Sequence, residues 1–248
     1  MFDALLELFP TLALLAPEPP GWGGNLLRGL VNSLQIALGA FGLGVLIGTL
    51  GAFGKLYGGP VLRDLLAVYT TVVRAVPELV LILILYYALT DAVNQVLVGM
   101  GYPRIVLSGV AAGIGVLGVV QGAYATEVIR GAILSVPAGQ IEAARAFGMP
   151  PLKLALRITL PLALAGAIPG LANLWLIATK DTALLAVVGF AELTLETRQA
   201  AGSTRAYFTF FLAAGLLYLL VTLVSGWLFG RIEARARRGQ PGATGGRG

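Results

Sequence analysis

Cysteine and histidine are both absent from the chain of 248 residues. Their absence excludes a disulfide framework, and it excludes metal sites built from thiolate or imidazole ligands. It also removes the side chain that most often serves as a general base in enzymes. A membrane-embedded enzyme would have to use carboxylates alone, and Glu78, Glu127 and Asp181 are its candidate acids and bases.

Charged residues are also scarce, at 12% of the chain, whereas about 25% is typical of soluble domains. Hydrophobic residues make up 57%. A chain of this composition cannot cover itself with polar surface, so an integral membrane protein is the first inference. The net charge of +5 alone would be compatible with nucleic-acid binding. The positions of the basic residues, described below, instead explain this net charge as a signal of membrane orientation. We therefore expect no nucleic-acid partner.

Five apolar stretches are long enough to cross a bilayer, because about twenty helical residues reach across a hydrocarbon core of about 30 Å. We place these spans at about residues 28–53, 63–89, 105–132, 158–179 and 207–229. The expected fold class is therefore an all-α membrane protein with five transmembrane helices. Pro77 should kink the second span, because proline removes a backbone hydrogen bond. Residues 91–104 should form a separate interfacial helix.

The two ends of the chain differ from its apolar centre. Residues 1–21 begin without basic residues and contain Pro10, so we expect a short interfacial segment rather than a cleaved signal peptide or a further span. Residues 22–234 should form the transmembrane domain. Residues 235–248 are basic and then glycine-rich, and we expect them to be a disordered cytoplasmic tail.

The basic residues predict how the chain is oriented in the membrane. Of the 17 lysines and arginines, eleven fall in the turn after the first span, the loop around Glu142 and the C-terminal tail. Five fall in the remaining loops, and Arg74 lies within a span. Cytoplasmic loops carry an excess of lysine and arginine. We therefore expect the N-terminus outside and the C-terminus in the cytoplasm of a plasma membrane.

Two glycine patterns have simple interpretations. Gly113–Gly118 matches G-x-G-x-x-G but lies inside an apolar span, without the strand-to-helix turn that a dinucleotide site needs. Gly44 and Gly48 form a G-x-x-x-G pair, which is typical of close helix packing in membranes. No phosphate-binding G-x-x-x-x-G-K-[ST] motif occurs, so the chain itself should not hydrolyse ATP.

A polar stretch, Glu142–Pro161, interrupts the apolar chain between the third and fourth spans. Its first residues favour a short helix that can run to Phe147, and Gly148 is placed to end it in a left-handed conformation. Pro150 and Pro151 suit the first turn of a new helix. An ordinary positively charged cytoplasmic loop would be the simplest interpretation.

The spacing within this stretch is more specific. The pattern E-A-A-x-x-x-G is followed by nine residues and then by Ile158-x-Leu160-Pro161, which resembles the cytoplasmic signature loop of ABC importer permeases. Segments 69–78, 121–140 and 180–189 are similar to the polar amino-acid branch of that family. The first of them looks most like permeases for histidine, arginine, lysine and ornithine. Two residues depart from the family pattern. Ala75 follows Arg74 where the family often has glycine. Glu78 stands where many permeases for neutral amino acids have an apolar residue.

The resemblance covers about residues 24–238 and implies a type I ABC importer permease fold. It implies that Glu142, Ala143, Ala144 and Gly148 belong to a coupling helix that docks on an ATPase subunit. The expected partners are ABC ATPase subunits, an extracytoplasmic amino-acid-binding protein, a second permease subunit in a homodimer or heterodimer, and membrane lipid. No cofactor is expected. The expected cargo is a basic amino acid; glutamine or glutamate is the alternative, and an ion-coupled secondary transporter is a remoter one.

Ionisable residues within spans indicate a pathway or a binding site, because each is costly in hydrocarbon. Arg74 and Glu78 would share one face of an unbroken helix. They could form an ion pair that only lets the span insert, or Glu78 could face a cavity and receive a cationic side chain. A kink at Pro77 favours the second possibility, since it would redirect Glu78.

Other polar residues in the spans are further candidates for substrate binding. Glu127 lies three residues before Arg130 and could form a salt bridge or contact substrate. Asp181 and Thr182 close the fourth span, where they could line a cavity or cap the next helix. Gln121 and Tyr124 are uncharged candidates, and an interhelical hydrogen bond is the alternative for Gln121.

Overall fold

The computed structural model describes residues 10–105 and 108–237, and every regular element within these ranges is a helix. The long helices are α2 (Gly23–Tyr57), α3 (Pro60–Ala75), α4 (Glu78–Gly99), α5 (Gly109–Leu134), α8 (Leu160–Asp181), α9 (Leu193–Thr204) and α10 (Tyr207–Ala236). The short elements are η1 (Pro10–Leu15), α6 (Ala138–Ala146), α7 (Pro151–Leu154), the π-helical turn η2 (Ala155–Thr159) and the 3-10 helix η3 (Thr182–Val188). The expectations for residues 1–9 and 238–248 lie outside the described ranges.

Within residues 10–105 and 108–237, five helical runs are long and apolar enough to cross a membrane, which confirms the predicted number. They are Gly23–Tyr57, Glu78–Gly99, Gly109–Leu134, Pro151–Val188 and Tyr207–Ala236. Several are longer than the sequence indicated, because polar and glycine residues continue the helices beyond their apolar centres. Helix α10 runs through Arg235 to Ala236, so the first residues of the predicted tail are helical.

The predicted second span, residues 63–89, is wrong as a single kinked helix. Helix α3 ends at Ala75, Val76 is extended, and a new helix, α4, starts at Glu78 and continues without a break to Gly99. Pro77 accounts for this break, since it lacks an N–H group and pushes the residue before it out of the α region. Residues 91–104 accordingly form no separate interfacial helix, because α4 includes most of them.

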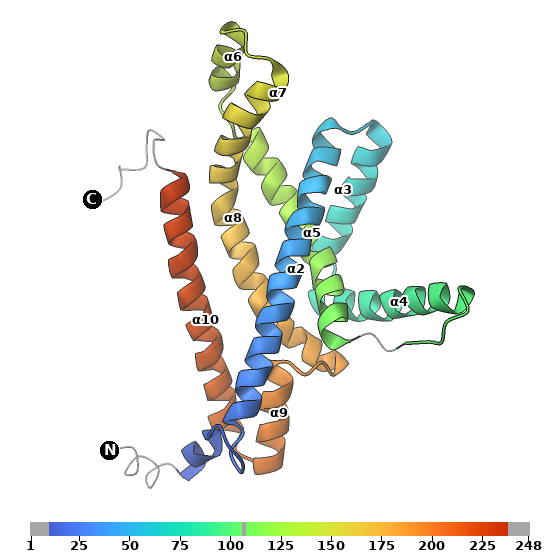
Figure 1. Ribbon diagram of the computed structural model, residues 1–248, viewed down its shortest axis with the longest axis vertical. Coiled ribbons are helices and arrows are strands. Elements are labelled where there is room, and N and C mark those ends of the chain that lie inside the picture. Colours follow the sequence, from blue (N-terminus) through green and yellow to red (C-terminus); the bar gives the residue numbers. More distant parts are fainter. Residues whose placement is uncertain (1–9, 106–107, 238–248) are drawn as a thin grey trace.

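The long helices α2, α5, α8 and α10 run along the length of the molecule, while α4 projects sideways (Figure 1). Helix α2 packs most extensively against α5. Helices α6 and α7, the turn between α2 and α3, and the C-terminal end of α10 lie towards one end of the molecule, and η1 and α9 lie at the other (Figure 1). The three segments rich in basic residues therefore share an end, as the charge pattern predicted.

Glycines bring α2 and α5 into close contact. A Cβ atom at Gly48 would lie 2.4 Å from Ala125 Cβ and 2.8 Å from its backbone carbonyl carbon. A Cβ atom at Gly44 would lie 2.8 Å from Gln121 Cβ. The prediction that these two glycines pack between helices is confirmed. The Gly113–Gly118 segment has the same role, since both of its end glycines face side chains of neighbouring helices.

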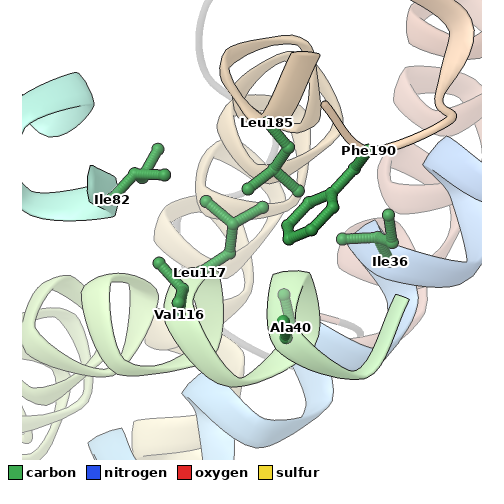
Figure 2. Close-up of a cluster of buried hydrophobic side chains, with 8 residues drawn as sticks. Ile36, Ala40, Ile82, Val116, Leu117, Leu185 and Phe190 are labelled. Carbon is green, nitrogen blue, oxygen red and sulfur yellow. The ribbon is translucent and has the colours of Figure 1, made fainter. Parts of the chain in front are cut away.

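A buried apolar cluster packs around the junction between the end of α8 and the start of η3. It joins α2, α4, α5 and η3 with Phe190, which lies two residues after η3 (Figure 2). Its members are Ile36, Ala40, Ile82, Ala112, Val116, Leu117, Leu185 and Phe190. The ring of Phe190 also meets that of Tyr86 edge to face, with centroids 5.3 Å apart. This packing holds the start of α4 beside the end of α8, where the candidate residues lie.

The close contact of α2 with α5 gives a first testable prediction. Gly48→Leu should lower the free energy of unfolding by about 2 kcal/mol or more, because its side chain would collide with the backbone of α5. Gly42→Leu is the matched control, since nothing lies within 4 Å of a Cβ atom at that position. Thermal unfolding of the purified protein in detergent measures both variants, and equal losses would contradict the proposed packing.

Candidate functional site

Five polar residues from four helices lie near one another in the transmembrane domain, with Gln121 buried, Arg74 exposed and the other three half-buried: Arg74, Glu78, Gln121, Tyr124 and Asp181. The amide Nε2 of Gln121 donates to Asp181 Oδ2 at 3.3 Å. The guanidinium of Arg74 lies 5.9 Å from the centroid of the Tyr124 ring. Glu78 is near enough to both Tyr124 and Asp181 to interact with each. We refer to these five residues as the polar cluster.

The break at Pro77 shapes this cluster. Arg74 lies in the last turn of α3 and Glu78 in the first turn of α4, so the two do not share a helix face. Among the residues that the structure describes, they form no ion pair within 4 Å. The alternative in which Glu78 is simply neutralised by Arg74 is therefore absent from this conformation.

Thr182, another sequence candidate, directs its hydroxyl away from the cluster. It is fully buried, and its Oγ1 donates to the carbonyl of Thr179 at 2.9 Å. Asp181 occupies the position before η3, but its side chain accepts no capping hydrogen bond. Of the two roles open from the sequence, Asp181 thus faces the polar cluster, and Thr182 stabilises the helix end that carries it.

Glu127 lies in a separate group of charges, six residues beyond Gln121 on α5. Lys55 Nζ donates to Glu127 Oε1 at 2.5 Å and to Thr70 Oγ1 at 2.8 Å. Arg130 donates to Glu127 Oε2 through Nε at 3.1 Å and through a terminal nitrogen at 3.0 Å. The side chains of Lys55 and Glu127 are only 11% and 19% exposed. The Arg130 salt bridge was one of the possibilities open from the sequence, and it is present.

No local pattern in the sequence indicates the Lys55 contact with Glu127. Lys55 was counted with the turn that follows the first span, but α2 continues to Tyr57 and carries Lys55 inside the bundle. Its ammonium lies in the last turn of α2, where the helix dipole favours a positive charge. The contact could not be expected without knowing that α2 extends to Tyr57.

The residues of the signature loop form the expected short helix. Glu142 and Ala143 are exposed on α6, whereas Ala144 is buried. Gly148 has φ +69°, a left-handed conformation that suits glycine, and its N–H donates to the carbonyl of Arg145. Pro151 begins α7, as predicted.

The outer surface of α6 is hollowed and apolar. A recess of about 370 Å³ is lined by Gln140, Ala143, Ala144, Phe147, Met149 and Ile158. Phe147, which follows α6 directly, is 89% exposed. The exposed ring and the apolar recess form one continuous surface, which is typical of a protein–protein contact.

Sequence reasoning did not single out Glu192, which is fully buried before α9. Its carboxylate accepts hydrogen bonds from the N–H groups of Thr194 and Leu195, from Ser33 Oγ and from the Tyr218 hydroxyl, at 2.7–3.3 Å. Burial raises the pKa of Glu192, although all four donors act in the opposite direction. The carboxylate is satisfied on all sides, so it anchors α9 to α2 and α10. Glutamate is not a favoured N-cap residue, and nothing local in the sequence marks this role.

Comparison with known proteins places this arrangement in a class. The chain belongs to the family of binding-protein-dependent transport system inner membrane components, whose sequence profile matches residues 40–238. It is 40% identical over 222 residues to the octopine transport system permease protein of Rhizobium radiobacter, covering 89% of this chain and 94% of that protein. It is 39% identical over 215 residues to the histidine/lysine/arginine/ornithine transport system permease protein of Escherichia coli, covering 87% and 94%.

Solved structures agree with this assignment. A crystal structure of an amino acid ABC transporter with histidines matches with a TM-score of 0.73 and 29% identity, over 86% of this chain and 95% of that one. The inward-facing methionine ABC transporter matches with a TM-score of 0.71 over 89% and 100% of the two chains. Its identity is 21%, so that likeness concerns the fold alone.

These findings define the protein as a permease subunit of an amino-acid ABC importer in the bacterial inner membrane. ATP is hydrolysed by a separate subunit, and a substrate-binding partner belongs to the same system. The enzymatic and ion-coupled alternatives are therefore wrong. The type I importer fold expected from the signature loop is confirmed.

The charge group around Glu127 gives a second prediction. Lys55→Met should lower the free energy of unfolding by about 1–2 kcal/mol, because it removes one of the two cations beside a poorly solvated carboxylate. The loss should shrink when Glu127 is already glutamine, and thermal unfolding of the single and double variants measures this difference.

Arg63→Met is the control for Lys55→Met. Arg63 pairs with Asp64 at 3.6 Å on the exposed surface, where an ion pair contributes at most about 1 kcal/mol. If Lys55→Met costs no more than Arg63→Met, the Lys55–Glu127 contact does not stabilise the fold.

Proposed function

We propose that this permease imports basic amino acids and that the polar cluster is their binding site within the membrane. The observation that carries the proposal is the polar cluster itself, in which Asp181 accepts a hydrogen bond from Gln121 at 3.3 Å and lies close enough to Glu78, from another helix, to interact with it. Among the described residues, neither carboxylate is in an ion pair. Carboxylates at membrane depth are costly unless a cation accompanies them. A cationic cargo would supply that charge.

The composition of the cluster suits an amino acid with a basic side chain. Arg74 offers a guanidinium to the cargo's carboxylate, and such pairs are frequently bidentate. Glu78 and Asp181 offer acceptors to its two cationic groups. With both carboxylates ionised, these three residues carry one net negative charge, which one basic amino acid neutralises. The names of the octopine and histidine/lysine/arginine/ornithine relatives support a basic cargo.

The remaining sequence candidates take supporting roles in this proposal. Thr182 positions Asp181 through its bond at the end of α8. Tyr124 lies beside Arg74, whose guanidinium is 5.9 Å from the ring centroid, and it is close enough to Glu78 to interact with it. Glu127 is already neutralised by Lys55 and Arg130, so we assign it to the packing of α2 against α5.

The proposed docking of an ATPase subunit at α6 agrees with the membrane orientation expected from the basic residues. Residues Glu142, Ala143, Ala144 and Gly148 form the coupling helix and its end, and the apolar recess beside Phe147 receives the ATPase. On this proposal the α6 end of the molecule lies in the cytoplasm, together with the C-terminal end of α10, which is at the same end (Figure 1). The N-terminus is then outside, and the amino-acid-binding protein meets the opposite end, which includes residues 190–205, and the 91–104 segment.

A second permease subunit would cover an apolar stripe on α3. Val61, Leu65, Val68 and Val72 recur at helical spacing and are all exposed. Helix α3 has only 16 residues and does not span a membrane by itself. We infer that this stripe packs against the second subunit, whether another copy or a similar chain, while the exposed leucines of α10 face lipid.

Glu142→Lys tests the coupling role. The variant should insert and assemble but lose most ATP-driven uptake, at least about tenfold, because its reversed charge faces the ATPase. Glu233→Lys, a charge reversal near the end of α10, is the matched control and should leave uptake unchanged. Uptake by proteoliposomes that contain the whole complex measures both. Normal uptake by Glu142→Lys would contradict docking at α6.

Glu78→Gln tests the cargo. Arginine-stimulated ATP hydrolysis by the complex reconstituted with its binding protein should fall at least about tenfold, because one of the two acceptor charges is lost. Asp64→Asn, which removes an exposed carboxylate, should have no effect. Stimulation of the unmodified complex by glutamine or glutamate instead of arginine or histidine would overturn the basic cargo. Loss of folded Glu78→Gln protein would indicate a structural role for Glu78.

A further inference from the structure

The side chain of Gln121 has one polar atom engaged and one free. It is 1% exposed, and its Nε2 donates to Asp181 Oδ2 at 3.3 Å. Its Oε1 is buried and has no hydrogen-bond partner among the described residues. Exchange of the two amide atoms would place an oxygen against the carboxylate of Asp181, so the hydrogen bond fixes which atom is left unpaired.

The base of this side chain is also held in place. Helix α2 approaches so closely at Gly44 that a Cβ atom there would lie 2.8 Å from Gln121 Cβ. The amide is thus tied at its tip by Asp181 and confined at its base by the backbone of α2. A polar group held in this way is preorganised for a ligand, because little freedom remains to be lost on binding.

We propose that Gln121 makes the site selective for a guanidinium group over an ammonium group. The inference rests on the proposed function and specifies its cargo: basic amino acids and related compounds that end in guanidinium. Glu78 from α4, Gln121 from α5 and Asp181 from α8 present three acceptor groups. A guanidinium carries five N–H donors in a planar fork, which can serve two carboxylates and an amide oxygen together.

An ammonium fits this set of acceptors less well. Its three donors leave a single nitrogen, so it reaches all three groups only where they lie about 3 Å from one point, and the two carboxylates neutralise its charge without Gln121. Gln121 Oε1 would then stay buried and unpaired. A site built to bond a ligand's N–H groups rejects an analogue that leaves those acceptors empty. Because Gln121 is uncharged, it adds no charge attraction that all cations would share. It favours only those cations whose N–H groups can reach its Oε1.

The unmodified protein provides the first test. Equilibrium dialysis with radiolabelled arginine and lysine is carried out on the permease in its complex with the ATPase subunits, without the binding protein. We expect arginine to bind at least about tenfold more tightly than lysine, the effect of one hydrogen bond to a charged group. Equal affinities would overturn the selectivity while leaving a basic cargo in place.

Gln121→Met provides the second test, since methionine keeps the length of the side chain and removes the amide. Arginine affinity should fall about tenfold or more and lysine affinity less than about threefold, so the ratio between them should collapse. Thr90→Val is the matched control. Thr90 Oγ1 is the other buried oxygen without a partner in the described chain, but it lies on α4 about 18 Å along the helix from Glu78. Its removal should leave both affinities unchanged.

The outcomes separate this inference from the function on which it rests. A parallel loss of arginine and lysine affinity in Gln121→Met would show that Gln121 only supports the helices, and it would overturn the selectivity. Binding of glutamine, with no binding of arginine or lysine, would overturn the basic cargo itself. If Gln121→Met does not assemble, the comparison of arginine with lysine on the unmodified protein still decides.

Discussion

The close approach of α2 and α5 is the contact on which the rest of the structure depends. Gly44 and Gly48 remove the side chains that would hold the two helices apart, so backbone approaches backbone over about one turn. In a membrane there is little hydrophobic gain from burying leucine, and packing of this kind becomes the main source of helix association. The same approach confines Gln121 and brings Lys55 within reach of Glu127.

The break at Pro77 is the second constraint, and it gives the polar cluster its arrangement. A continuous helix would have placed Arg74 and Glu78 on one face, where they would neutralise each other. Two helices that meet at an extended residue instead aim the last turn of α3 and the first turn of α4 at different neighbours. The cluster therefore keeps the Arg74 cation out of an ion pair with the two carboxylates, as the proposed binding of a zwitterionic cargo with a basic side chain would require.

Much of the architecture could be predicted from the sequence because its signals are local. The number of spans follows from apolar length, and the end of α6 follows from Gly148. What could not be predicted depends on partners distant in the chain. The Lys55–Glu127 pair spans 72 residues and the Ser33–Glu192 bond spans 159. All five members of the polar cluster were candidates from the sequence. Glu127 was a candidate too, and only the fold shows that it lies outside the cluster.

The two cations on Glu127 have a consequence for movement. Arg130 belongs to the same helix as Glu127 and holds one carboxylate oxygen, whereas Lys55 holds the other oxygen from α2. If α2 swings away from α5, the carboxylate keeps a counter-ion throughout the displacement. The electrostatic cost of separating the helices therefore falls on Lys55 alone, which would have to leave its carboxylate partner.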